Sequence, residues 1–183
     1  MTRAMNVTLA NGTPAEGRMR DLLSELLLAH PLDGWIFTDR IRIAEGANPH
    51  SHPVLTMNTA HTADSRMALA EFLHEQLHWF EEAHVEQRDR FIEATGLRYP
   101  EVPAARPEGA GDETSTRLHL LVCHLEHQAL ASLIGAEAAR ATVQRLSAHH
   151  YSWVYRTILK DAASIDDLAR RHGLIPAPLL VGS

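Results

Sequence analysis

The sequence predicts an α+β fold that is mainly helical, with a small antiparallel β-sheet or hairpin ahead of its best-defined helix. Three observations lead to this prediction: leucines at helical spacing near the start, a β-rich stretch bounded by turn residues, and a long amphipathic segment after residue 65. The chain has 183 residues, a length typical of one domain. We therefore expect a single domain that spans 1–183.

The first part of the chain is expected to supply one helix and the strands. Leucines recur at helical spacing over 19–29, which predicts an amphipathic helix. β-rich stretches follow at 35–38 and 41–43. Turn-forming residues at 45–49 then precede a returning strand at 53–59, so we expect a hairpin or the edge of a small sheet.

The best-defined helix is predicted over 66–90, where apolar residues form one stripe and Ser65 can serve as the N-cap. Prolines and glycines then mark a loop over 96–112, which is long enough to be a lid or a binding segment. Gly135 is a suitable C-cap for the helix before it. The remaining helices are expected at 114–133, 136–148 and 152–163.

Composition excludes several classes of function. The chain carries 17 basic and 23 acidic residues, so it has no basic surface for nucleic acid or an anionic membrane. Its apolar stretches fall far short of the roughly 18 residues of a membrane span, and its start lacks a secretory signal. The single cysteine, Cys123, cannot form an internal disulfide. We expect a cytoplasmic protein without nucleic-acid or membrane partners.

Histidine is unusually frequent, with 13 copies, and two of them form a chemically meaningful pair. Residues 74–78 read HEQLH, which matches the H-E-x-x-H pattern within a predicted helix. Four residues along a helix turn a side chain back to within about 40° of its start, so His74 and His78 can reach one metal ion. Glu75 is turned about 100° away, where it can take a proton from a metal-bound water.

A metal ion needs a third protein ligand, and the helix predicted over 114–133 carries the candidates. Helical angles counted from Leu118 place Glu126 at about 80° and His119 at about 100°, at the border of the apolar face. A carboxylate beside the core is costly unless it is paired or binds a metal, so Glu126 is the first choice. His119 is the alternative, as the third ligand or as a hydrogen-bond donor to an oxyanion. A buried ion pair would also explain both residues.

Other polar residues receive a structural or a weaker functional interpretation. The same helical angles turn His124 and His127 toward solvent, and Cys123 is expected to be a small buried residue. The hydroxyl of Tyr155 could stabilise an oxyanion, although packing of an aromatic helix is the simpler explanation. Three histidines beside the predicted returning strand are expected to be exposed in turns: His50, His52 and His61.

The H-E-x-x-H helix after a β-segment, with Glu126 on a later helix, resembles the zincin metallopeptidases, and most closely the gluzincin-type branch whose third ligand is glutamate. Segment 53–59 and the motif also resemble a group of small bacterial H-E-x-x-H proteins. The resemblance implies a zinc ion held by His74, His78 and Glu126. It also implies Glu75 as the general base and an extended peptide held by backbone pairing on the strand before the helix.

The sequence therefore predicts a zinc-dependent hydrolase, most simply a peptidase-like enzyme in which activated water attacks a carbonyl of a peptide or small-molecule substrate. Two histidines and a carboxylate also form the facial triad of non-haem iron enzymes. The first alternative is thus a zinc or iron enzyme that acts on a small molecule in a biosynthetic pathway. The second is a non-catalytic regulatory protein whose metal site is closed by a fourth protein ligand such as His119.

Overall fold

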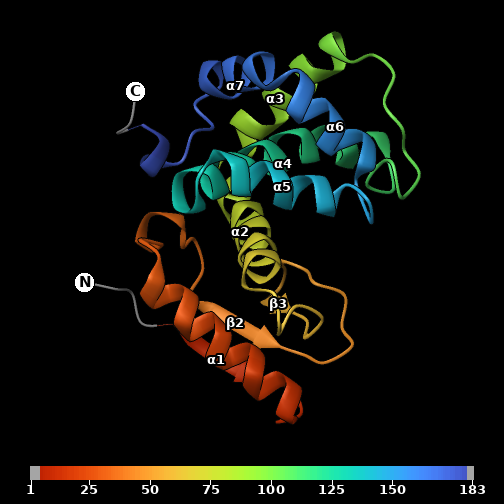
Figure 1. The fold of residues 1–183 in the computed structure, drawn as a ribbon. Coiled ribbons are helices and arrows are strands. Elements are labelled where there is room, and N and C mark those ends of the chain that lie inside the picture. Colours follow the sequence, from red (N-terminus) through yellow and green to blue (C-terminus); the bar gives the residue numbers. More distant parts are fainter. Residues whose placement is uncertain (1–4, 181–183) are drawn as a thin grey trace. The chain divides into compact units, whose positions relative to one another are not determined.

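The structure is a computed structural model that describes residues 5–180. It confirms the predicted α+β, mainly helical class, since the described residues form seven α-helices and one three-stranded sheet. The chain divides into two compact units, one up to residue 80 and one from residue 81 onward (Figure 1). The expectation of a single domain stays a prediction.

The first unit is built on a parallel sheet. Its strands are β1 (Asn6–Leu9), β2 (Arg40–Ile43) and β3 (Leu55–Met57), which are hydrogen-bonded in the order β1-β2-β3. The central strand β2 runs parallel to both neighbours. Helix α1 (Pro14–Ala29) contacts β1 and β2 (Figure 1).

The antiparallel arrangement expected for the strands is wrong. The chain does turn back after β2, and His50 pairs in antiparallel fashion with Thr56. A second reversal before Leu55 then brings β3 alongside β2 in the parallel direction. The β-rich stretch at 35–38 is not a strand, because a 3-10 turn at Asp33–Trp35 leads into it. β1 is a further strand that was not predicted from the sequence.

Helix α1 begins at Pro14 rather than near residue 19. The Thr13 hydroxyl accepts the backbone N–H of Glu16, and the Glu16 carboxylate accepts the backbone N–H of Thr13, which is a capping box. The same carboxylate also accepts the backbone N–H of Glu45 at 3.0 Å. Glu16 therefore ties the start of α1 to the segment that follows β2.

The long helix predicted over 66–90 is two helices, α2 (Ser65–Glu82) and α3 (Val85–Arg98). Apolar spacing continues on both sides of the break, so periodicity alone predicts one helix. The predicted N-cap is also wrong by one residue. Asp64 caps α2, since its Oδ1 accepts the backbone N–H of Met67 at 3.2 Å.

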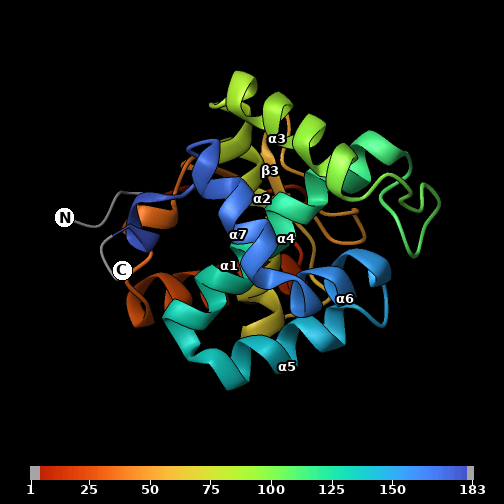
Figure 2. The same cartoon turned by 90° about the horizontal axis from the view of Figure 1, so that it is seen from above.

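The second unit consists of helices that pack around α4 (Glu113–Ile134). The other helices of this unit are α3, α5 (Ala136–Leu146), α6 (Ser152–Lys160) and α7 (Ala162–Arg171). α4 contacts all four of them (Figure 2). Every residue over 119–126 is buried, so this stretch of α4 has no side that faces solvent.

This burial overturns the prediction that His124 faces solvent. Its side chain is fully buried, and its Nε2 lies 3.4 Å from Oδ1 of Asp166 on α7. His127 is partly exposed. Helical angles identify a solvent face only where part of the helix surface is exposed, and α4 is covered on all sides over 119–126. The helix expected at 152–163 is likewise split at Asp161 into α6 and α7.

The segment between α3 and α4 is a loop, as predicted, and it is tightly bonded. The backbone N–H of Gly109 bonds to the Ala105 carbonyl at 2.8 Å. A Cβ at Gly109 would collide with the Pro103 carbonyl oxygen, so this position requires glycine. The Pro107 carbonyl accepts the backbone N–H of Ser152 at the start of α6. These contacts tie the loop to itself and to α6.

Candidate metal centre

The H-E-x-x-H residues lie on α2 in the first unit, and the middle residue of the motif, Gln76, fixes how this helix is turned. Its side chain is fully buried. The Oε1 atom accepts the backbone N–H groups of Phe37 at 2.7 Å and Thr38 at 2.9 Å, and Nε2 donates to the Thr38 carbonyl at 2.8 Å. These bonds hold one side of α2 against the segment before β2.

Two further contacts hold other sides of α2. The Oε1 atom of Glu71 accepts the backbone N–H of Asn58, just after β3, at 3.0 Å. The Nε1 atom of Trp79 donates to the Ser51 carbonyl at 2.8 Å. By helical angles these side chains and Gln76 leave the helix in three different directions. Rotation of α2 about its axis would therefore break at least one of these contacts.

His74 and His78 lie side by side on α2, and their separation fits a shared metal ion. Their ring centres are 5.1 Å apart and their planes meet at 72°. A zinc–nitrogen bond of about 2.1 Å places a ring centre roughly 3.2 Å from the ion, so two ligands at a tetrahedral angle have ring centres about 5.2 Å apart. His74 and Glu75 are buried, and His78 is partly exposed.

His119 lies near the start of α4 in the second unit, where it is buried. Its Nδ1 is 2.7 Å from the carbonyl oxygen of Ser115. A carbonyl only accepts hydrogen bonds, so Nδ1 carries the hydrogen and Nε2 of the neutral ring carries the lone pair. This tautomer suits a metal ligand. A protonated ring would also carry a hydrogen on Nε2, which is the donor that an oxyanion needs.

Glu126 and Tyr155 are in contact in the second unit. Both are fully buried, and the Tyr155 hydroxyl donates to Oε2 of Glu126 at 3.0 Å. Burial, together with the neighbouring Cys123 and Glu126, raises the pKa of Tyr155 well above its ordinary value, so the phenol keeps its proton. The Tyr155 hydroxyl therefore orients the Glu126 carboxylate, and its role toward an oxyanion stays a prediction.

Cys123 is buried, as predicted. Burial, and next the charge of Glu126, raises the pKa of the Cys123 thiol well above its ordinary value. The thiolate is the form that binds metals, so a metal ion at Cys123 would have to displace this proton.

The outer edge of β3 is occupied by the chain itself. The backbone N–H of Thr56 donates to the His50 carbonyl at 2.7 Å, and the Thr56 carbonyl accepts the N–H of His50 at 3.1 Å. Further along, the N–H of Asn58 bonds to Glu71. These are the groups with which an added peptide strand would pair. The edge that the zincin resemblance assigns to an extended peptide is therefore closed at these positions.

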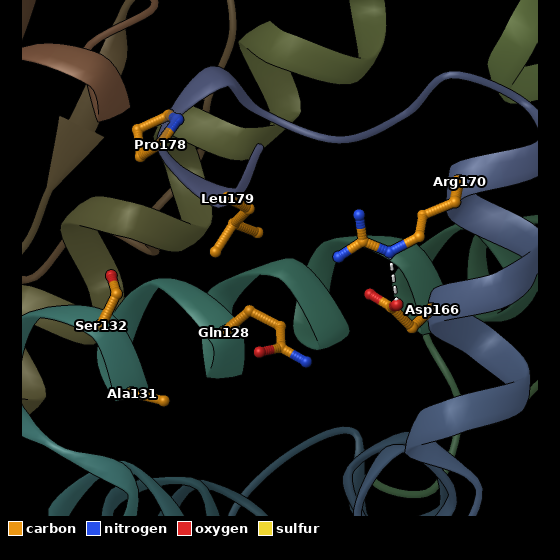
Figure 3. Close-up of a pocket in the computed structure, with 7 residues that line it drawn as sticks. All are labelled: Gln128, Ala131, Ser132, Asp166, Arg170, Pro178 and Leu179. Carbon is orange, nitrogen blue, oxygen red and sulfur yellow. Dashed lines mark hydrogen bonds and ion pairs between the residues drawn. The ribbon is translucent and has the colours of Figure 1, made fainter. Parts of the chain in front are cut away.

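A cavity of about 340 Å³ lies between α4, α7 and the C-terminal segment of the second unit (Figure 3). Its polar lining includes Asp166, whose Oδ2 accepts Nε–H of Arg170 at 2.7 Å. The buried His124 reaches the same carboxylate, and burial lowers its pKa to about 4, so its ring is neutral. None of the predicted site residues, all of which the structure describes, lines this cavity.

Sequence reasoning missed two residues that hold the candidate ligands or their helix in place: Gln76 and Ser115. One signal was available for Gln76, because helical angles place this polar residue within the apolar stripe of α2. Ser115 acts through its main-chain carbonyl, which has no sequence signature. Of the histidines expected in turns, His50 is exposed, and His52 and His61 are partly exposed.

Comparisons of the chain with protein-family models, with curated proteins and with solved structures find no match. The resemblance to zincins therefore stays a prediction that rests on the motif. Among the residues that the structure describes, no helix combines the length and apolar character needed to cross a bilayer.

Proposed function

We propose that the protein is a metal-dependent hydrolase in which activated water attacks a carbonyl carbon, with zinc as the metal. The observation that carries the proposal is the His74–His78 pair, whose ring centres are separated as two ligands of one tetrahedral ion would be. The polar contacts of Gln76 and Glu71 support it, because a site works best on an element whose orientation is fixed.

The proposal takes its third ligand from α4 on chemical grounds. Glu126 is the first candidate, because a fully buried carboxylate is costly without a cation and the Tyr155 hydroxyl already orients it. His119 is the second, because its bond to Ser115 makes Nε2 the lone-pair atom. Both sets, two histidines with a glutamate or three histidines, occur in catalytic zinc sites.

Glu75 acts as the general base in this proposal. When bound, zinc would supply the Lewis acidity that makes a water molecule acidic near neutral pH. Glu75 follows His74 directly on α2 and takes the proton of the attacking water. It can then return that proton to the leaving group. Because the carboxylate is buried, it is shielded from bulk water.

The closed edge of β3 favours a small-molecule substrate over an extended peptide. A peptide that pairs with β3 must first displace the backbone bonds between His50 and Thr56. A compact amide or ester needs no such displacement. Within the hydrolase proposal, the small-molecule alternative thus has a specific observation in its favour.

Metal analysis of protein purified without added metal tests the proposal. We expect stoichiometric zinc in the wild type, loss of zinc in His74→Ala, and unchanged zinc in His149→Ala, which alters an exposed histidine. Loss of zinc in either Glu126→Ala or His119→Ala identifies the third ligand. A wild-type protein without metal, or with iron after anaerobic purification, contradicts a zinc site.

Glu75→Gln separates catalysis from metal binding. We expect full zinc content and a fall in turnover of about 10²–10⁴-fold, assayed with small amides and esters beside extended peptides. Glu82→Gln, at an exposed position of the same helix, should leave turnover unchanged. Retained turnover in Glu75→Gln removes the mechanism. Full zinc with no turnover by the wild type on either substrate set supports the regulatory alternative.

A further inference from the structure

Tyr151 is a feature of the second unit that the proposed function does not use. It immediately precedes α6, and its φ of 49° is the only positive φ of a non-glycine residue in the part of the chain that the structure describes. A left-handed backbone crowds the Cβ atom of an L-residue, so tyrosine is strained there unless its surroundings compensate. The strain calls for an explanation in terms of the side chain.

Backbone bonds on both sides of Tyr151 fix this conformation. The Tyr151 carbonyl accepts the N–H of Tyr155 at 2.9 Å, and the next residue, Ser152, donates its N–H to the Pro107 carbonyl at 2.9 Å. These bonds use only main-chain groups, and glycine could adopt the same backbone without strain. What tyrosine adds at this position is its phenol side chain.

The ring of Tyr151 lies against the ring of His119. The ring centres are 4.3 Å apart and the planes are tilted by 39°. At this distance the rings are in van der Waals contact, which restrains rotation of the imidazole about its Cβ–Cγ bond. The bond from Nδ1 to the Ser115 carbonyl is a second restraint. Together the two contacts fix the plane and the tautomer of His119.

Another histidine on the same helix shows the opposite arrangement. His124 directs its Nε2 toward Asp166, a carboxylate that accepts hydrogen bonds. Because the buried ring is neutral, its hydrogen is then on Nε2, the atom that carries the lone pair in His119. The tautomer of His119 is therefore set by its own contacts and is not a general property of α4.

We propose that Tyr151 is a positioning residue that holds His119 as a metal ligand. Its strained backbone carries the phenol ring against the imidazole, and Ser115 sets the tautomer, so that Nε2 is presented as the ligand atom. The inference rests on the proposed function and assigns the third ligand to His119, which leaves Glu126 outside the ligand set. Groups that orient a ligand from behind commonly change metal affinity by about 10–100-fold when they are removed.

Variants of Tyr151 distinguish the effect of its ring on zinc binding from the effects of its hydroxyl and of its strained backbone. Tyr151→Phe keeps the ring, so we expect the wild-type zinc Kd. Tyr151→Gly removes the ring and relieves the strain, so the zinc Kd should rise about 10–100-fold while Tm falls by less than about 4 °C. Tyr151→Asn, which also tolerates a left-handed backbone, takes its place if the glycine variant does not fold. Ala148→Gly, at an exposed position nearby, should leave the zinc Kd unchanged.

The tautomer of His119 is read in the zinc-free protein by long-range ¹H–¹⁵N NMR, with its signals assigned by comparison with His119→Gln. We expect the hydrogen on Nδ1 alone in the wild type and Tyr151→Phe, and a mixture of tautomers in Tyr151→Gly. A glycine variant with the wild-type tautomer and the wild-type zinc Kd overturns the positioning role. A wild-type protein that binds no zinc overturns the proposed function, and a changed tautomer in Tyr151→Gly would still show that Tyr151 positions His119.

Discussion

Helices α2 and α4 carry the candidate ligands, and each is held in its own unit by different means. Polar side chains fix α2, with Gln76 and Glu71 bonded to main-chain groups of the first unit. Burial fixes α4, which has no solvent side over 119–126. The difference shows that a hydrophobic pattern predicts the exposed side of a helix only where the helix has one. Angles counted along α4 predict an exposed His124, and the structure buries it.

The largest effect tests the polar anchoring of α2. Gln76→Leu leaves three main-chain groups without their partner: two buried groups of Thr38 and the partly buried N–H of Phe37. Each such group costs about 1–3 kcal/mol, so we expect the free energy of unfolding in urea to fall by about 4 kcal/mol. Gln144→Leu, at an exposed position of α5, should change it by less than about 0.5 kcal/mol. If Gln76→Leu lowers the free energy of unfolding by less than about 1 kcal/mol, burial alone holds α2, as it holds α4.

Burial of α4 predicts a stability that is lost in acid. The pKa of His124 is lowered to about 4 from its ordinary 6.5, chiefly by burial. The unfolded chain binds this proton more readily, so stability is full above pH 6.5 and falls by about 3 kcal/mol as the pH drops toward 4. His124→Gln should flatten this dependence in urea unfolding, whereas His149→Gln, an exposed control, should keep it. The same slope in both variants would contradict the assignment to His124.

Glu71 on α2 predicts the opposite dependence on pH. Burial raises its pKa to about 7 from the ordinary 4.5, against the bond from Asn58. The folded protein binds this proton more readily, so stability is full below pH 4.5 and falls by about 3 kcal/mol as the pH rises through 7. Glu71→Gln keeps an oxygen for the Asn58 N–H and should stabilise the protein at pH 8 but not at pH 4. Glu25→Gln, exposed on α1, should do neither; matching effects of the two variants would exclude Glu71 as the cause.

The smallest effects come from the two N-caps. The Oδ1 atom of Asp64 accepts the backbone N–H of Met67 at the start of α2. Asp112 accepts the backbone N–H and the hydroxyl of Ser115 at the start of α4. Replacing either by alanine should cost about 1 kcal/mol in urea unfolding. An unchanged free energy of unfolding in either variant would contradict its role as a cap.

Local patterns were enough to predict most helices but not the sheet. Gly135 ends α4 at the predicted residue, because a C-cap depends on the conformation of one position. Strand direction depends instead on how the connection between two strands runs. Segments 41–43 and 53–59 look alike in parallel and antiparallel sheets, and only the His50–Thr56 bridge shows that the chain reverses twice between them.

The candidate site follows the same division. The spacing of His74 and His78 is local, so sequence could predict that their rings lie together. The hydrogen bond between Glu126 and Tyr155 joins residues on different helices, so no pattern within either helix predicts it. The left-handed backbone of Tyr151 could not be predicted from the sequence either. Tyrosine rarely adopts this conformation, and the residues beside it give no local signal for it.

The closed outer edge of β3 also affects how copies of this protein meet each other. A sheet edge with unpaired N–H and C=O groups is a template on which further chains add, and such growth leads to aggregation. His50 exchanges both backbone bonds with Thr56, and Glu71 takes the N–H of Asn58 further along. The turn around His50 thus acts as a built-in end to the sheet. It prevents further strands from adding to this side of β3, and no additional helix or loop is needed to cover the edge.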